Sequence, residues 1–153
     1  MKFRYLSIVA LISLASCDDF TKPHEAAFTA NGTAYTCGED DVTANYYNTT
    51  ENHLQVVAYA NGSEKHSVAF VVDLDRVSEV VAIDSAQEGC YFLWANSSIY
   101  YTVLSGQWEI TEYEEGNPAS RHTEGNFEFL AVNPYDSADT VRVTNGSFYV
   151  NNY

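Results

Sequence analysis

The chain has 153 residues, of which 21 are Asp or Glu and seven are Lys or Arg, so its formal net charge is −14. Nucleic acid is excluded as a partner, because proteins bind it through clustered Lys and Arg. The motifs Gly-x-Ser-x-Gly, HExxH and Cys-x-x-Cys are absent, as is a phosphate-cradling Gly loop. The sequence therefore favours a protein that is not an enzyme, and it predicts no cofactor.

The first 16 residues have the order of a secretory signal peptide. Lys2 and Arg4 precede an apolar run over residues 6–15, which is too short for a membrane-spanning helix of about 20 residues. The run ends in Leu-Ala-Ser-Cys at residues 14–17, which resembles the lipobox recognised by bacterial lipoprotein-processing enzymes. This resemblance implies cleavage before Cys17 and attachment of acyl chains such as palmitate to the Cys17 thiol.

Residues 17–25 carry charge and a proline without periodicity, which predicts a lipidated acidic tether. Asp18 and Asp19 resemble the acidic signal that sends lipoproteins of the Bacteroidetes to the outer face of the outer membrane. We therefore expect an outer-membrane protein exposed at the cell surface, with the periplasmic leaflet as the alternative. The lipid on Cys17 is its expected contact with the membrane, because anionic headgroups would repel so acidic a domain.

Two cysteines remain once Cys17 is assigned to lipid. Cys37 and Cys90 are expected to form a disulfide in the oxidising envelope. The bond would close a loop of about 54 residues, worth roughly 4 kcal/mol in the chain-entropy model. Two free thiols are the alternative.

Residues 26–153 predict a single all-β domain, because turn signals separate short runs of β-branched and aromatic residues. The expected fold is an antiparallel β-sandwich of about eight to ten short strands, and a meander closed into a small β-barrel is the alternative. Residues 75–83 are compatible with a helical turn capped by Asp75 or with a strand. Other strands are expected at residues 54–60, 67–72, 91–94, 99–104, 107–113 and 127–132.

Asn-Gly dipeptides predict hairpin turns, because both residues accept positive φ. A two-residue turn at 31–32 pairs Phe28 with Tyr35 and places Cys37 on the same inner face. A turn at 145–146 pairs Val143 with Phe148. At the dipeptide at 61–62 we expect a longer loop or a bulge, because a two-residue register there mixes apolar and polar partners. Four residues at a period of two are expected to point inward: Trp108, Ile110, Phe127 and Phe129.

Four segments follow one another along the second half of the chain: GCYFL at 89–93, GQWEITEY at 106–113, EGNFEF at 124–129 and VRVTNGSF at 141–148. Their order, with the turn after Phe28, resembles an uncharacterised family of small β-rich lipoproteins from Bacteroidetes. The resemblance covers most of residues 26–153 and implies a fold without implying a chemistry. Its members commonly carry Trp where this chain has Tyr35, and Cys37 and Cys90 are not part of the pattern.

Aromatic residues are the candidate ligand contacts. Tyr46 and Tyr47 fall in an expected loop over residues 38–52, and Trp94 and Tyr100 fall in strands whose side chains alternate between faces. Exposed Tyr and Trp are common in glycan-binding surfaces and protein interfaces. The alternative is that Tyr is simply a good strand residue.

Ser85, Ser137 and Thr140 each follow Asp and precede an apolar residue. This order resembles the acceptor motif of O-glycosylation in Bacteroidetes, and local turn chemistry is the competing interpretation. No metal site is predicted, since the histidines lack ligand spacing and no EF-hand loop is present. The weak calcium candidates are two acidic groups: Glu39, Asp40 and Asp41, and Asp73 and Asp75.

The predicted function is that of a lipid-anchored cell-envelope lipoprotein, a non-enzymatic binding or structural module with a glycan or an envelope protein as its ligand. One alternative is a small carboxylate-dependent hydrolase such as a glycosidase, because two of the 21 acidic residues can meet in space. A passive envelope component is another.

Overall fold

The computed structural model describes residues 22–48, 52–60, 66–83, 92–96, 99–114 and 122–151. These residues are nearly all strand, which confirms the predicted all-β class. No helix among them has the length and apolar character needed to cross a membrane. The described strands are β1 (Glu25–Ala30), β2 (Thr33–Cys37), β3 (Val42–Asn48), β4 (Asn52–Tyr59), β5 (His66–Asp73), β6 (Val81–Ile83), β7 (Phe92–Asn96), β8 (Ile99–Glu114), β9 (His122–Asn133) and β10 (Asp136–Asn151). Two 3₁₀ turns join them, η1 (Glu39–Asp41) and η3 (Leu74–Arg76).

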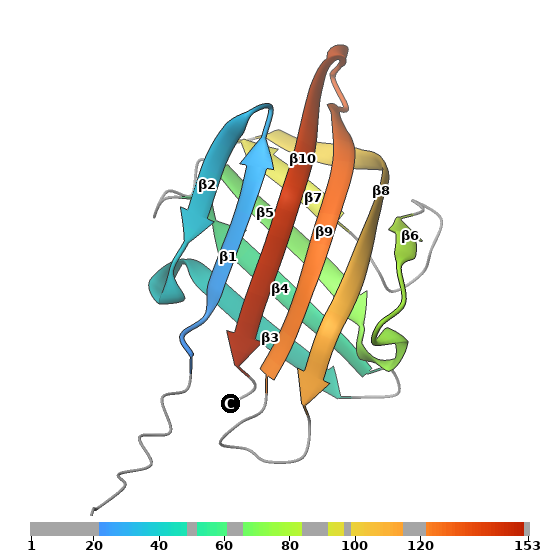
Figure 1. The fold of residues 1–153 in the computed structure, drawn as a ribbon. Coiled ribbons are helices and arrows are strands. Elements are labelled where there is room, and N and C mark those ends of the chain that lie inside the picture. Colours follow the sequence, from blue (N-terminus) through green and yellow to red (C-terminus); the bar gives the residue numbers. More distant parts are fainter. Residues whose placement is uncertain are drawn as a thin grey trace, which may run out of the picture.

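The strands form one curled antiparallel sheet in the order β2-β1-β10-β9-β8-β7-β5-β4-β3, with β6 beside β8. The half that holds β1, β10, β9 and β8 lies in front of the half that holds β3, β4, β5 and β7 (Figure 1). Most paired strands follow one another along the chain, as in a meander, and the exceptions are the pairs β1–β10, β5–β7 and β6–β8. β2 and β3 are the two edges and do not pair with each other within the described residues, so the sheet is a half-barrel.

The core fills the space between the two halves of this sheet. Phe70 of β5 lies between two rings of the facing half, with ring centroids 5.1 Å from Phe127 and 5.0 Å from Phe148. The four residues predicted to point inward are all buried: Trp108, Ile110, Phe127 and Phe129. Burial of these large apolar side chains is the main contribution to stability, at about 1.5–3 kcal/mol for each.

Three glycines of the front half lie directly opposite phenylalanines. Gly106 pairs with Phe129, and Gly125 and Gly146 pair with Phe148 and Phe127. A Cβ atom added to Gly125 would lie 2.6 Å from the Phe148 ring, and one added to Gly146 would lie 2.5 Å from the Phe127 ring. The rings therefore occupy the space that side chains at these positions would need.

The hairpin at residues 31–32 has the predicted register. Phe28 pairs with Tyr35, and Cys37 lies opposite Ala26. Asn31 and Gly32 have φ of 47° and 82°, as a two-residue turn with positive φ at both positions requires. The Phe28 and Tyr35 rings stack with centroids 5.4 Å apart, which places this aromatic pair against the core.

The predicted hairpin at residues 145–146 is wrong, because β10 runs through it as one strand. Asn145 has φ of 51° and lies in a β-bulge, where the pairing with β9 shifts between Val143 and Gly146. The extra residue moves the inward positions from odd to even numbers. Val143 and Phe148 therefore both face the core as predicted, although they do not pair with each other.

Three smaller expectations have different outcomes. The connection after β4 is longer than a two-residue turn, as predicted, because Tyr59 pairs with Ser67; its Asn-Gly dipeptide lies outside the described residues. Residues 75–83 contain part of a 3₁₀ turn and a short strand, and the residue that caps the turn is Asp73 rather than Asp75. The prediction of a loop over residues 38–52 is wrong, because strand β3 lies within this range.

Replacing Gly125 by Ala should destabilise the domain by about 1–3 kcal/mol, the usual cost of overpacking a filled core. The new Cβ would overlap the Phe148 ring and the backbone oxygen of Glu109. Gly38→Ala is the control, because no atom lies within 4 Å of its added Cβ. Urea unfolding measures both variants, and equal unfolding free energies would contradict the close glycine–phenylalanine contacts.

Candidate functional site

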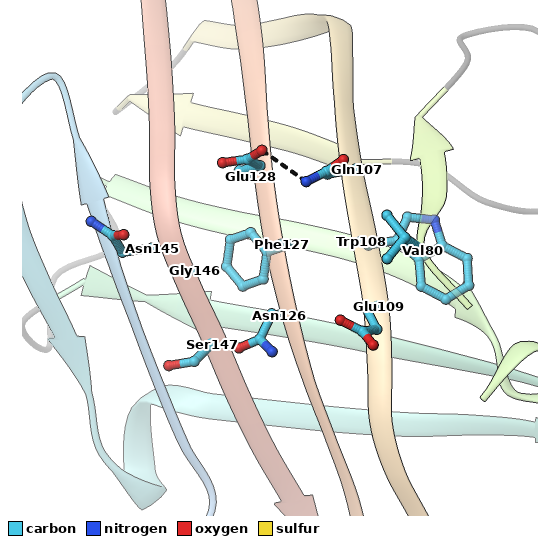
Figure 2. A pocket seen from close by; sticks show the side chains of 10 residues that line it. All are labelled: Val80, Gln107, Trp108, Glu109, Asn126, Phe127, Glu128, Asn145, Gly146 and Ser147. Atoms are coloured by element: carbon cyan, nitrogen blue, oxygen red, sulfur yellow. Dashed lines mark hydrogen bonds between the residues drawn. The ribbon is translucent and has the colours of Figure 1, made fainter. Parts of the chain in front are cut away.

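The outer face of β8, β9 and β10 forms a polar groove of about 400 Å³. Because side chains alternate along a strand, the residues between the buried positions face away from the core. Figure 2 shows these polar side chains beside one another on the three strands. They are Gln107 and Glu109 from β8, Asn126 and Glu128 from β9, and Asn145 and Ser147 from β10.

One side-chain hydrogen bond crosses the groove. The Nε2 atom of Gln107 donates to Oε1 of Glu128 over 3.0 Å, between residues that lie directly opposite on β8 and β9 (Figure 2). Glu109 lies directly opposite Asn126 on the same two strands, so Glu109 and Glu128 are diagonal neighbours. No lysine, arginine or histidine is among the residues that line the groove. The groove therefore presents amides, carboxylates and a hydroxyl to a ligand, and the negative charge of its carboxylates disfavours anions.

The predicted ligand-contact aromatics do not form one exposed strip. Tyr100 is exposed, with 67% of its surface accessible, whereas Trp94 retains only 3%. The prediction for Trp94 is wrong, because its ring packs edge-on against Phe28 and stacks on His66. Tyr46 is half-buried against the core, and burial raises the pKa of its hydroxyl, which lies 3.3 Å from Thr123 Oγ1. The side chain of Tyr47 lies outside the described part of the structure.

The two acidic groups considered for calcium lie in the 3₁₀ turns. Asp73 Oδ1 accepts the backbone N–H of Asp75, and Asp75 Oδ1 accepts from Asn52 Nδ2 over 3.1 Å. These bonds use the carboxylates to order the turn. Glu39, Asp40 and Asp41 form η1, and none of the three is buried.

The tip between β9 and β10 carries two of the candidate glycosylation sites. Ser137 and Thr140 are exposed, and Ser85 lies outside the described residues. The neighbouring acids have local roles: Asp136 accepts the N–H of Ala138, and Asp139 accepts from Tyr101 and Asn133. These bonds agree with the turn-chemistry interpretation, while exposure leaves both hydroxyls open to modification.

The cysteines are described only in part. Cys37 is buried and its thiol is free in the structure, while Cys90 lies outside the described residues, so the disulfide stays a prediction. Burial raises the pKa of the Cys37 thiol to about 11, and the charge of Asp41 adds to the effect. In this state the thiol is a poor nucleophile, because the thiolate is the reactive form.

A second cluster of polar side chains was not predicted from the sequence. Glu112, His122 and Glu124 carry potential metal-ligating atoms that all lie within 4.8 Å of one another. They come from two strands, so their sequence spacing does not show that they meet. A prediction of the β8–β9 register would have been needed to find them.

Comparisons with models of known families, with curated proteins and with solved structures found no match to this chain. The resemblance to the small lipoproteins of Bacteroidetes therefore stays a prediction. The predicted signal peptide and Cys17 lie outside the described residues, so both stay predictions.

Replacing Asp139 by Asn should reduce stability most at neutral pH. Hydrogen bonds from Tyr101 and Asn133 lower the pKa of the Asp139 carboxyl. Its stabilisation is therefore present above the unfolded-state pKa of about 3.9 and is lost as the pH falls through the lowered folded-state value. Urea unfolding at a series of pH values should show a difference from wild type that narrows below about pH 4.

Asp40→Asn is the control, because this acid lies exposed on η1. A difference from wild type that depends on pH no more for Asp139→Asn than for Asp40→Asn would mean that the two hydrogen bonds do not favour the charged carboxylate.

Proposed function

We propose that this chain is an envelope lipoprotein that is anchored through lipid on Cys17 and binds a neutral, hydroxyl-rich ligand such as a glycan. The groove on β8, β9 and β10 carries this proposal, because it is lined by amides, carboxylates and a hydroxyl. These groups supply both donors and acceptors for sugar hydroxyls. Anionic ligands are disfavoured, because Glu109 and Glu128 are the only charged residues that line the groove.

The groove suits weak binding at a surface. Its volume of about 400 Å³ falls within the usual range for ligand pockets, which is roughly 300–1,000 Å³. Most such pockets are largely apolar, whereas the two aromatic residues that line this one, Trp108 and Phe127, are buried. Affinity would then depend on hydrogen bonds, each worth about 0.5–1.5 kcal/mol.

The proposed location is supported by the sequence alone. The signal peptide order, the lipobox-like residues 14–17 and the acids after Cys17 support export and an outer-membrane anchor facing the cell surface. The periplasmic leaflet remains the alternative. Two or more acyl chains on Cys17 would hold the protein stably, where a single chain binds only marginally.

A carboxylate-dependent hydrolase is the second candidate function, and one observation favours it. Glu109 and Glu128 are diagonal neighbours on paired strands, whose backbone positions lie about 7–8 Å apart, so their flexible side chains can bring the two carboxyl groups to a similar separation. Inverting glycosidases separate their two carboxyl groups by about 6.5–9.5 Å. The hydrogen bond from Gln107 counts against this function, because it already occupies one oxygen of the Glu128 carboxylate.

Asn126→Ala should weaken glycan binding by roughly two- to tenfold, the value of one hydrogen bond. The probe is an array of neutral oligosaccharides, followed by calorimetry with the best binder. Asn45→Ala is the matched control, because Asn45 is an exposed asparagine on β3, in the other half of the sheet. Equal affinities for both variants would refute the groove as the binding site. Release of products that Glu128→Gln abolishes would show a hydrolase instead.

Cys17→Ala should abolish incorporation of radiolabelled palmitate and move the protein from the membrane fraction to the soluble fraction. The substitution removes only the thiol group of Cys17, so both effects would follow from the loss of the attachment site. Cys37→Ala is the control and should keep its label. Continued labelling and membrane retention of Cys17→Ala would place the anchor elsewhere.

A further inference from the structure

We infer that Glu112, His122 and Glu124 form a binding site for a divalent transition-metal ion at the end of the outer face where β8 stops and β9 begins (Figure 1). The site is separate from the polar groove and does not depend on the proposed glycan binding. Nitrogen and oxygen ligands from two strands meet there. Four observations support it: the strand register, the distances, the fixed imidazole and the local charge.

A bulge in β8 brings the acidic residues to this face. Ile110 is buried and pairs with Gly125, so an unbroken strand would turn Glu112 inward. The pairing shifts between Ile110 and Glu112, and Glu112 instead lies opposite Glu124 on the outer face. Bulges of this kind re-aim side chains and are frequent beside functional sites.

The distances fit an ion with bonds of about 2.0–2.2 Å. His122 Nε2 lies 3.3 Å from Glu112 Oε1, close to the edge of a tetrahedron with such bonds. The ligating atoms of Glu124 are within 4.8 Å of the other two, which small rotations of the glutamate side chains can shorten. The other imidazole nitrogen, Nδ1, lies 3.9 Å from Glu114 Oε2. This distance is too long for a hydrogen bond, but a rotation of the Glu114 side chain would let it accept from Nδ1, as carboxylates do that orient metal-binding histidines.

The His122 ring is held in place by the neighbouring strand. It stacks on Tyr149 with centroids 5.3 Å apart and an interplanar angle of 23°, and only 15% of its side chain is accessible. Tyr149 is itself fixed, because its hydroxyl donates to Asn151 Oδ1 over 3.0 Å. A ligand with a locked ring loses little entropy when an ion binds.

The local charge favours a cation. Glu112 and Glu124 are directly opposite on paired strands, and like charges in this arrangement destabilise a sheet. Glu114 adds a third carboxylate opposite His122. Lys22 feels the charge of Glu124, but its salt bridge is with Glu25. A divalent ion would remove this repulsion.

The donor set selects the class of ion. Calcium and magnesium prefer oxygen ligands alone, whereas imidazole suits zinc, nickel, copper and iron. One imidazole with two carboxylates therefore indicates a first-row transition metal, with water completing the coordination because Glu112 is largely exposed.

Calorimetric titration of the EDTA-treated, untagged chain with Zn²⁺ tests the site. One saturable site is expected, and Glu112→Gln and His122→Gln should each weaken it at least tenfold, since loss of a group that only supports a ligand already costs 10–100-fold. Glu109→Gln, on the same strand and outside the cluster, should bind as wild type does.

Metal-free stability gives an independent measurement. Without the ion, Glu112→Gln should unfold at a slightly higher urea concentration than wild type, because it removes a like-charge pair. With Zn²⁺ the order should reverse. The inference is overturned if Zn²⁺ does not bind, if Glu112→Gln binds it as tightly as wild type does, or if Ca²⁺ stabilises the protein equally.

Discussion

The contact of two phenylalanine rings with two glycines of neighbouring strands determines how the sheet can curl. A half-barrel this small must bring its two halves close enough for one layer of side chains to fill the interior. Phe70 from one half reaches between Phe127 and Phe148 of the other, and these two rings lie over Gly146 and Gly125. Any side chain at either glycine would push a ring toward Phe70. The same contacts therefore determine both the packing of the core and the curvature of the sheet.

Two β-bulges determine which side chains of β8 and β10 face the core and which face outward. In β10 the extra residue at Asn145 keeps Val143 and Phe148 inside while the strand continues between β1 and β9. In β8 the second shift turns Glu112 outward after the buried Ile110. The same device thus fills the interior in one strand and supplies a metal ligand in another. Both candidate sites lie on the outer face of β8, β9 and β10, the longest of the described strands.

The sequence predicted the features that depend on neighbours along the chain. The hairpin at residues 31–32 is one of these, because its turn and its aromatic pair are within eight residues of each other. The Asn-Gly dipeptide at 145–146 has the same local chemistry, yet β1 and β9 pair with β10 on both sides and make it a bulge. The meeting of Glu112 with His122 depends on a bulge that no residue pattern marks. Burial of Trp94 likewise depends on which face of β7 the sheet curls over.

The pairing of β1 with β10 has a consequence for the order in which the protein folds. Glu25 lies opposite Tyr149, and Asn151 donates to the backbone oxygen of Lys22, so the central strand of the front half is the last one to be made. The β1–β2 hairpin has no neighbour on its β1 side until that strand arrives. Contacts of such long sequence separation also make folding slow. In any process that releases the chain N-terminus first, the front half of the sheet can close only after β10 has emerged.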